Sequence, residues 1–178
     1  MLEGKFLKRI DWRTSAELVG LAAIVVSLIF VGLELRQSQK IALAAQYQAR
    51  TEAGREYFYQ SLASSYRIDD LAEEIESWEW PGGLLSADDT QWLDEHTPSV
   101  AAEATYWAVI NLYGFDNYYF QYQSGLLSEE GWLALQSRLR SLLRDDPFAR
   151  YLIVVTGQNF RESFVLLCKS LLTDMDSK

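Results

Sequence analysis

The chain has 178 residues, 49% of them hydrophobic and 23% charged, which suits one folded domain and argues against a disordered segment. The formal net charge of −9 argues against a nucleic-acid binder, because phosphate contacts require clustered Lys and Arg. One cysteine and one histidine exclude an intramolecular disulfide and a zinc site built from several Cys and His ligands.

An uncharged run of sixteen residues, 18–33, lies near the N-terminus between Glu17 and Glu34. The run is apolar on all sides, whereas an amphipathic helix on a soluble protein would show a polar face. A membrane span usually needs roughly 20 residues, so the buried core helix of a soluble protein is the alternative. The basic residues before the run favour a span: Lys5, Lys8, Arg9 and Arg13.

These features predict three segments. Residues 1–14 form a basic N-terminal segment, residues 15–36 a transmembrane helix and residues 37–178 an α-helical domain. No small-residue cleavage site directly follows the apolar run, so we expect the segment to remain as an anchor rather than to be removed as a signal peptide.

Small residues recur along one side of the predicted span at intervals of three and four, and the pattern continues beyond it. Such a stripe lets two helix backbones approach closely in lipid, where packing drives association. The alternative is that Ala is simply common in helices. We predict a helix–helix interface at Ala16, Gly20, Ala23, Ser27, Ala42, Ala45 and Ala49.

The apolar run ends in the sequence Glu34-Leu35-Arg36-Gln37, and "ALAAQYQA" follows it. With this pattern the first fifty residues resemble a group of uncharacterised bacterial single-span membrane proteins, whose anchor helix ends in a Leu/Ile-Arg-Gln motif. The resemblance implies a single-pass protein of the bacterial inner membrane and carries no catalytic motif.

The orientation of the span stays open, because basic residues flank it almost equally on both sides. The similar proteins usually carry their basic residues after the span, and an unpaired cysteine suits a reducing compartment. We therefore predict a cytoplasmic C-terminal domain, with the periplasmic side as the alternative.

The sequence of the remaining chain predicts an all-α fold, with a small helical bundle after the long N-terminal helix. Because no proline occurs from Ser15 to about Ser61, we expect one long helix over these residues. A short helix follows, with Asp69 and Asp70 in its first turn, and Pro81 ends it.

Capping residues divide the rest of the domain into further helices. The residues expected to begin them are Ser86, Thr97 before Pro98, Ser128, Asp146 before Pro147, and Asn159 with Glu162. We expect Gly157 to interrupt the last helical region. No alternating strand pattern with hairpin turns is present in the sequence.

The segment 106–122 is the densest aromatic stretch of the chain. A helix that carries rings on several faces usually forms the centre of a bundle. Two other interpretations are open: a hydrophobic ligand lies against the rings, or a partner protein does, since Tyr and Trp are enriched at interfaces. The residues expected to make such contacts are Trp107, Phe115, Tyr118, Tyr119 and Tyr122.

The residues that could carry chemistry favour structural roles. A single histidine, His96, cannot supply the two Glu-x-x-His motifs of a di-iron bundle, and we expect it at the surface or at a helix end. Adjacent acids such as Asp88 and Asp89 point to different helix faces and are expected to be solvated. Cys168 lies in an apolar run and is expected in the core.

Trp78 and Trp80 either pack over the end of the bundle or lie at the bilayer interface. Together these observations predict no catalytic, cofactor-binding or metal site and no enzymatic activity.

The leading hypothesis is a membrane-anchored helical interaction protein, an accessory or structural subunit of a larger inner-membrane assembly. Its expected partners are membrane lipids and other membrane protein subunits or a second copy of the chain, and not nucleic acid. The alternative is a binder of a hydrophobic small molecule (a lipid, quinone or pigment) through the aromatic helix.

Overall fold

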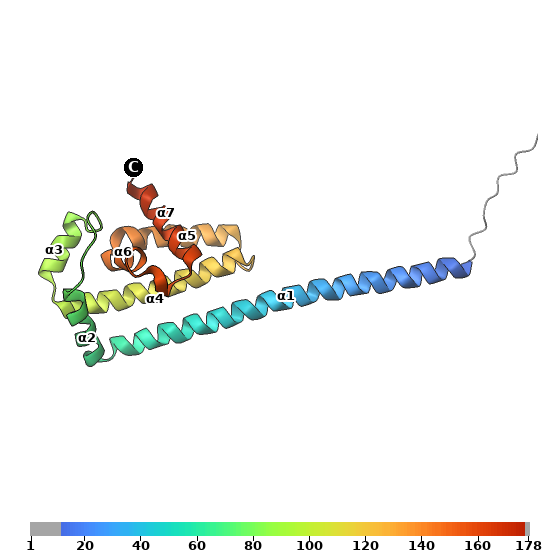
Figure 1. Cartoon of the computed structure of the whole chain (residues 1–178), viewed down its shortest axis with the longest axis horizontal. Helices are drawn as coiled ribbons and strands as arrows, with labels where there is room; N and C mark the ends of the chain where they lie inside the picture. The colour runs from blue at the N-terminus through green and yellow to red at the C-terminus, as the bar shows by residue number, and fades with distance from the viewer. Residues whose placement is uncertain (1–11, 177–178) are drawn as a thin grey trace, which may run out of the picture. The chain divides into compact units, whose positions relative to one another are not determined.

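The computed structural model describes residues 12–176, with side chains as far as Met175. Its helices in chain order are α1 (Trp12–Leu62), α2 (Ser65–Glu76), α3 (Ala87–Glu95), α4 (Pro98–Gln123), α5 (Glu129–Asp145), α6 (Pro147–Val154), the 3-10 helix η1 (Gly157–Asn159) and α7 (Glu162–Asp176) (Figure 1). No strand occurs between residues 12 and 176, so the predicted all-α fold is confirmed.

The chain divides into two compact units, Met1–Leu43 and Ala44–Lys178. The described part of the first unit is the N-terminal portion of α1. Its large apolar side chains are exposed all round, from Leu18 at 61% to Phe30 at 59%. By length and composition α1 is able to cross a membrane, and none of its most apolar eighteen residues is buried. Of the predicted basic segment, residues 1–14, the first eleven residues lie outside the described part of the chain.

The second unit is a bundle built around α4, which contacts α2, α5 and α6, while α7 packs on α5 and α6. Its core is made of aliphatic and aromatic side chains from α2 and from α4 to α7. The largest fully buried apolar residues are Ile110, Leu112, Leu139, Leu143, Phe148, Ile153, Phe164 and Cys168. Cys168 is therefore a core residue, as its apolar surroundings predict.

The C-terminal part of α1 also packs on this bundle. The face that does so consists of residues spaced three and four apart: Ala44, Tyr47, Thr51, Gly54, Phe58 and Ser61. The Tyr47 ring stacks on Phe120 with centroids 4.5 Å apart, and the Phe58 ring lies 6.0 Å from Tyr106. Residues early on this face meet residues late in α4, so the two helices run antiparallel. Gly54 lies beside the Tyr113 ring, which an added Cβ would meet at an ordinary contact distance of 3.7 Å.

Most predicted helix boundaries are confirmed. Ser86 and Asp89 form a capping box at the start of α3, and the Ser128 side chain accepts a hydrogen bond from the Gly131 N–H at the start of α5. The Asp146 carboxylate accepts from two backbone N–H groups of α6, and η1 begins at Gly157, where the last helical region is interrupted.

Two local predictions are wrong and a third is right only in part. Helix α2 begins at Ser65, so Asp69 and Asp70 lie beyond its first turn. Thr97 stands at the N-cap of α4 and Pro98 begins the helix, as predicted, but the Thr97 side chain makes no capping hydrogen bond. Asn159 ends η1 instead of capping α7, whose first carbonyl acceptor is that of Arg161.

Candidate functional site

The aromatic residues predicted for ligand or partner contact separate into two groups. Tyr119 and Tyr122 pack against Trp132 of α5, with ring centroids 5.1 and 5.5 Å away. These two half-buried rings therefore pack against the bundle core, as the structural interpretation of this helix predicts. Trp107 and Tyr118 are exposed by 50% and 39%, and Phe115 is half-buried.

The predicted small-residue stripe stays uncovered in the described chain. Ala16, Gly20, Ala23, Ser27, Ala42, Ala45 and Ala49 are all exposed. The α1 face that packs on α4 includes Ala44 and Thr51, which point to a different side of the helix from Ala45 and Ala49. Contact of the stripe with another helix remains a prediction.

A buried ion pair joins Arg161 to Asp116 of α4, whose side chain is only 4% exposed. The Arg161 Nε donates to Asp116 Oδ1 at 2.9 Å, and another nitrogen of the same guanidinium donates to the Asp116 carbonyl oxygen at 2.5 Å. The Tyr47 hydroxyl donates to the other carboxylate oxygen. We call these three residues the Asp116 cluster; they join α1, α4 and the start of α7.

The Asp116 cluster keeps its tyrosine neutral. Burial, followed by the hydrogen bond to the Asp116 carboxylate, raises the pKa of Tyr47 above its ordinary value of 10.0. The Arg161 guanidinium also lies 5.1 Å from the Tyr47 ring centroid and 5.0 Å from that of Phe120. The cation is thus paired, stacked and hydrogen-bonded, which suits a fixed structural junction rather than a reactive group.

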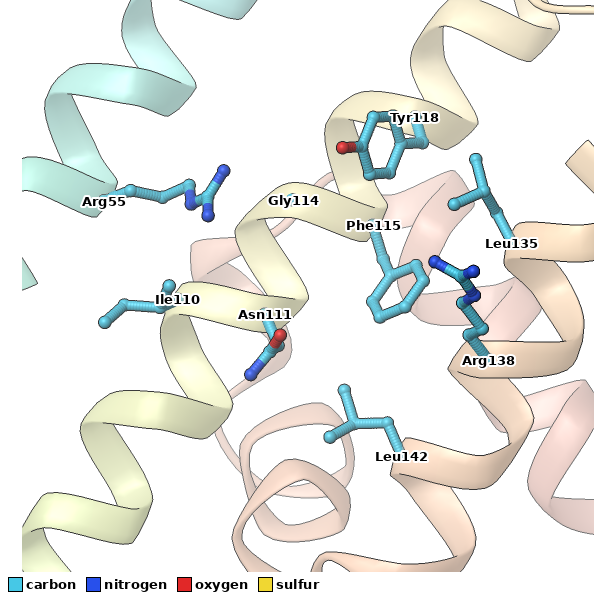
Figure 2. A pocket seen from close by; sticks show the side chains of 9 residues that line it. All are labelled: Arg55, Ile110, Asn111, Gly114, Phe115, Tyr118, Leu135, Arg138 and Leu142. Carbon is cyan, nitrogen blue, oxygen red and sulfur yellow. The ribbon is translucent and has the colours of Figure 1, made fainter. Parts of the chain in front are cut away.

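A cavity of about 400 Å³ lies on the other side of the α1–α4 contact. We call it the Gly114 cavity. Arg55 reaches it from α1 and Arg138 from α5, and they flank the stretch of α4 that carries Gly114 (Figure 2). Its other lining residues are Ile110, Asn111, Phe115, Tyr118, Leu135 and Leu142. A Cβ added at Gly114 would meet no atom within 4 Å, so this glycine leaves the surface open.

The remaining candidates have structural surroundings. The Trp78 ring stacks on Tyr151 at 4.0 Å, and Trp80 lies 5.9 Å from Phe148, so both tryptophans pack on the bundle. His96 follows α3 and stacks on Trp92 at 4.1 Å, in an exposed position at a helix end.

Asp89 corrects the prediction that the adjacent acids are solvated. Its side chain is 12% exposed, and Asp89 Oδ2 accepts a hydrogen bond of 2.5 Å from Arg150. The same guanidinium donates to the carbonyl oxygens of Leu84 and Leu143. Arg150 therefore ties the loop before α3 to the end of α5.

Two buried ion pairs, Asp116 with Arg161 and Asp89 with Arg150, were not predicted from the sequence. A usable signal was present, because Asp116 stands alone among aromatic residues and Arg150 stands in the apolar run "FARYLIV". A charge at such a position is buried only with a partner. The sequence does not indicate which of the many opposite charges that partner is.

Among residues 12–175, no three side chains of His, Cys, Asp or Glu are placed to hold a metal ion. Comparisons with protein-family models, curated proteins and solved structures return no significant match.

Proposed function

We propose that the chain is a membrane-anchored helical interaction protein, an accessory or structural subunit of a larger assembly in the bacterial inner membrane. The observation that carries the proposal is the exposed apolar surface of α1, where every large side chain from Leu18 to Leu35 is exposed by 48% or more. As a helix, residues 18–35 extend over about 27 Å. The hydrocarbon core of a bilayer is roughly 30 Å thick, and lipid would cover this surface completely.

The role in interaction is supported by the second unit, a helical bundle that the same chain joins to the proposed anchor. Within this unit the part of α1 from Ala44 packs on α4, where the Tyr47 hydroxyl donates to the Asp116 carboxylate. Because the chain ties the bundle to the proposed anchor, other subunits of the same membrane would be its partners.

An exposed aromatic pair offers a surface for such a partner. Tyr59 and Trp107 are exposed by 39% and 50%, and their rings lie edge to face at 5.8 Å. Tyrosine and tryptophan are enriched at protein interfaces, because they bury much area with little loss of conformational entropy.

The test is purification of the full chain from membranes in a mild nonionic detergent after crosslinking in the cell. The proposal expects a discrete crosslinked species, either a defined partner subunit or a second copy of the chain. Tyr59→Ala and Trp107→Ala together should reduce that species, whereas the exposed Tyr66→Ala should leave it unchanged. A chain that is recovered only as a monomer would contradict the proposal.

The cytoplasmic position of the bundle is part of the proposal and has its own test. Alkaline phosphatase fused at Lys178 should be inactive, because the enzyme needs the oxidising periplasm to form its disulfides. An active fusion would place the bundle in the periplasm.

A further inference from the structure

We propose that the Gly114 cavity binds an anionic amphiphile, whose carboxylate or phosphate group lies between Arg55 and Arg138 and whose apolar tail lies along Phe115 and α5. This site goes beyond the proposed anchoring and interaction, and its argument does not depend on them.

The first observation is the charge of the cavity. Its lining contains two arginines and no carboxylate, although the chain has 25 acidic residues and a net charge of −9. Five other described arginines are in ion pairs: Arg13, Arg140, Arg144, Arg150 and Arg161. Among the described residues neither Arg55 nor Arg138 has such a carboxylate partner. Two unneutralised cations in one hollow attract an anion from solution.

The second observation is the weak hold on Arg55. Its guanidinium donates one hydrogen bond, of 3.3 Å, to the Tyr59 hydroxyl, and its Nε is enclosed without any acceptor in the described chain. A buried donor that lacks an acceptor destabilises the protein. A small rotation of this flexible side chain toward an anion in the cavity would give the Nε an acceptor.

The third observation is the lining opposite the charges. Leu135 and Leu142 of α5 face the cavity together with Phe115 of α4, whose ring lies beside Arg138 in Figure 2. A volume of about 400 Å³ is within the range of small-molecule pockets. An inorganic anion would leave this apolar part wet, whereas an amphiphile fills it with its tail and pairs its head with the arginines.

The test uses the full chain in phosphatidylcholine nanodiscs and measures binding of radiolabelled octanoate by equilibrium dialysis against empty discs. We expect saturable binding of one octanoate per chain, displaced by octyl phosphate and not by uncharged octanol. Arg55→Gln and Arg138→Gln should each weaken binding by about tenfold or more, because each removes charge-assisted hydrogen bonds.

Three further variants separate the site from general effects of charge and folding. Arg50→Gln on α1 and Arg144→Gln on α5 remove cations of the same helices outside the cavity lining and should leave the affinity unchanged. Gly114→Leu fills the open surface and should abolish binding while the helical circular dichroism is retained.

Discs that contain phosphatidylglycerol identify the natural source of the anion. Competition with octanoate would assign the site to a lipid headgroup, and absence of competition to a free amphiphile. The proposal would be overturned by non-saturable binding, by displacement with octanol as effective as with octyl phosphate, or by a loss of octanoate affinity in the Arg50 and Arg144 variants equal to that in the Arg55 and Arg138 variants. Should the chain elute apart from the discs, the same dialysis applies to it directly, so failure of the site is distinguishable from failure of the anchor.

Discussion

Removal of the Arg161 side chain should destabilise the bundle more than removal of any exposed arginine. In Arg161→Met the Asp116 carboxylate, 4% exposed, loses its ion-pair partner and keeps only the Tyr47 hydroxyl as a side-chain donor. Breaking a buried pair from one side typically costs about 3–5 kcal/mol. Arg161 is 23% exposed, so water partly screens the loss, and we expect the lower end, about 3 kcal/mol.

A double-mutant cycle shows whether the loss comes from the stranded charge. Asp116→Asn keeps the shape of the side chain without its charge, so the double variant with Arg161→Met should recover more than half of the loss in stability. The free energies come from urea unfolding of the full chain in nonionic detergent, followed by tryptophan fluorescence.

The exposed pair of Arg144 with Asp145 provides the matched control, and Arg144→Met should leave the unfolding midpoint unchanged. The reasoning would be refuted if Arg161→Met behaved like Arg144→Met, or if the losses of the two single variants simply added in the double variant.

Three further predictions follow from other parts of the chain. Tyr47→Phe should lower stability at neutral pH by about 1.5–3 kcal/mol, the usual effect of losing a hydrogen bond to a charged group. Because the pKa of Tyr47 is raised by folding from 10.0, wild-type stability should also fall as pH rises above 10, and more steeply than that of Tyr47→Phe in alkaline urea titrations. Burial raises the pKa of the Cys168 thiol, so N-ethylmaleimide should label it, by mass spectrometry, only after urea unfolding, and labelling of the native chain would contradict its core position. Gly20→Ile or Ala23→Ile should weaken crosslinked association in membranes, whereas Val25→Ile should not; equal effects of all three would exclude the stripe as an interface.

Most helix boundaries could be predicted from the sequence because the residues that start a helix act locally. Ser86, Ser128 and Asp146 each act on backbone groups two or three residues away, so their spacing predicts the helix starts directly. The predicted helix start at Asn159 is wrong because this residue belongs to the 3-10 helix η1. The capping pattern alone does not predict that a 3-10 helix precedes α7.

The side of α1 that meets the bundle could not be predicted in the same way. Ala45 and Ala49 belong to the regular small-residue stripe, yet Tyr47, Thr51 and Gly54 face the bundle, where Tyr47 stacks on Phe120 and Gly54 lies beside Tyr113. Which face is used depends on a partner helix roughly sixty residues away in the chain, and no local pattern indicates it. The Gly114 cavity is likewise formed by α1, α4 and α5 together.

Alkaline carbonate extraction of cell membranes tests most directly whether α1 is a membrane anchor. The full chain should remain in the membrane pellet, because nothing in the described chain covers the apolar surface of residues 18–35 and lipid would cover it. A chain that lacks residues 1–35 should move to the supernatant and keep its helical circular dichroism. Release of the full chain by carbonate, or its recovery as a soluble protein without detergent, would contradict the account.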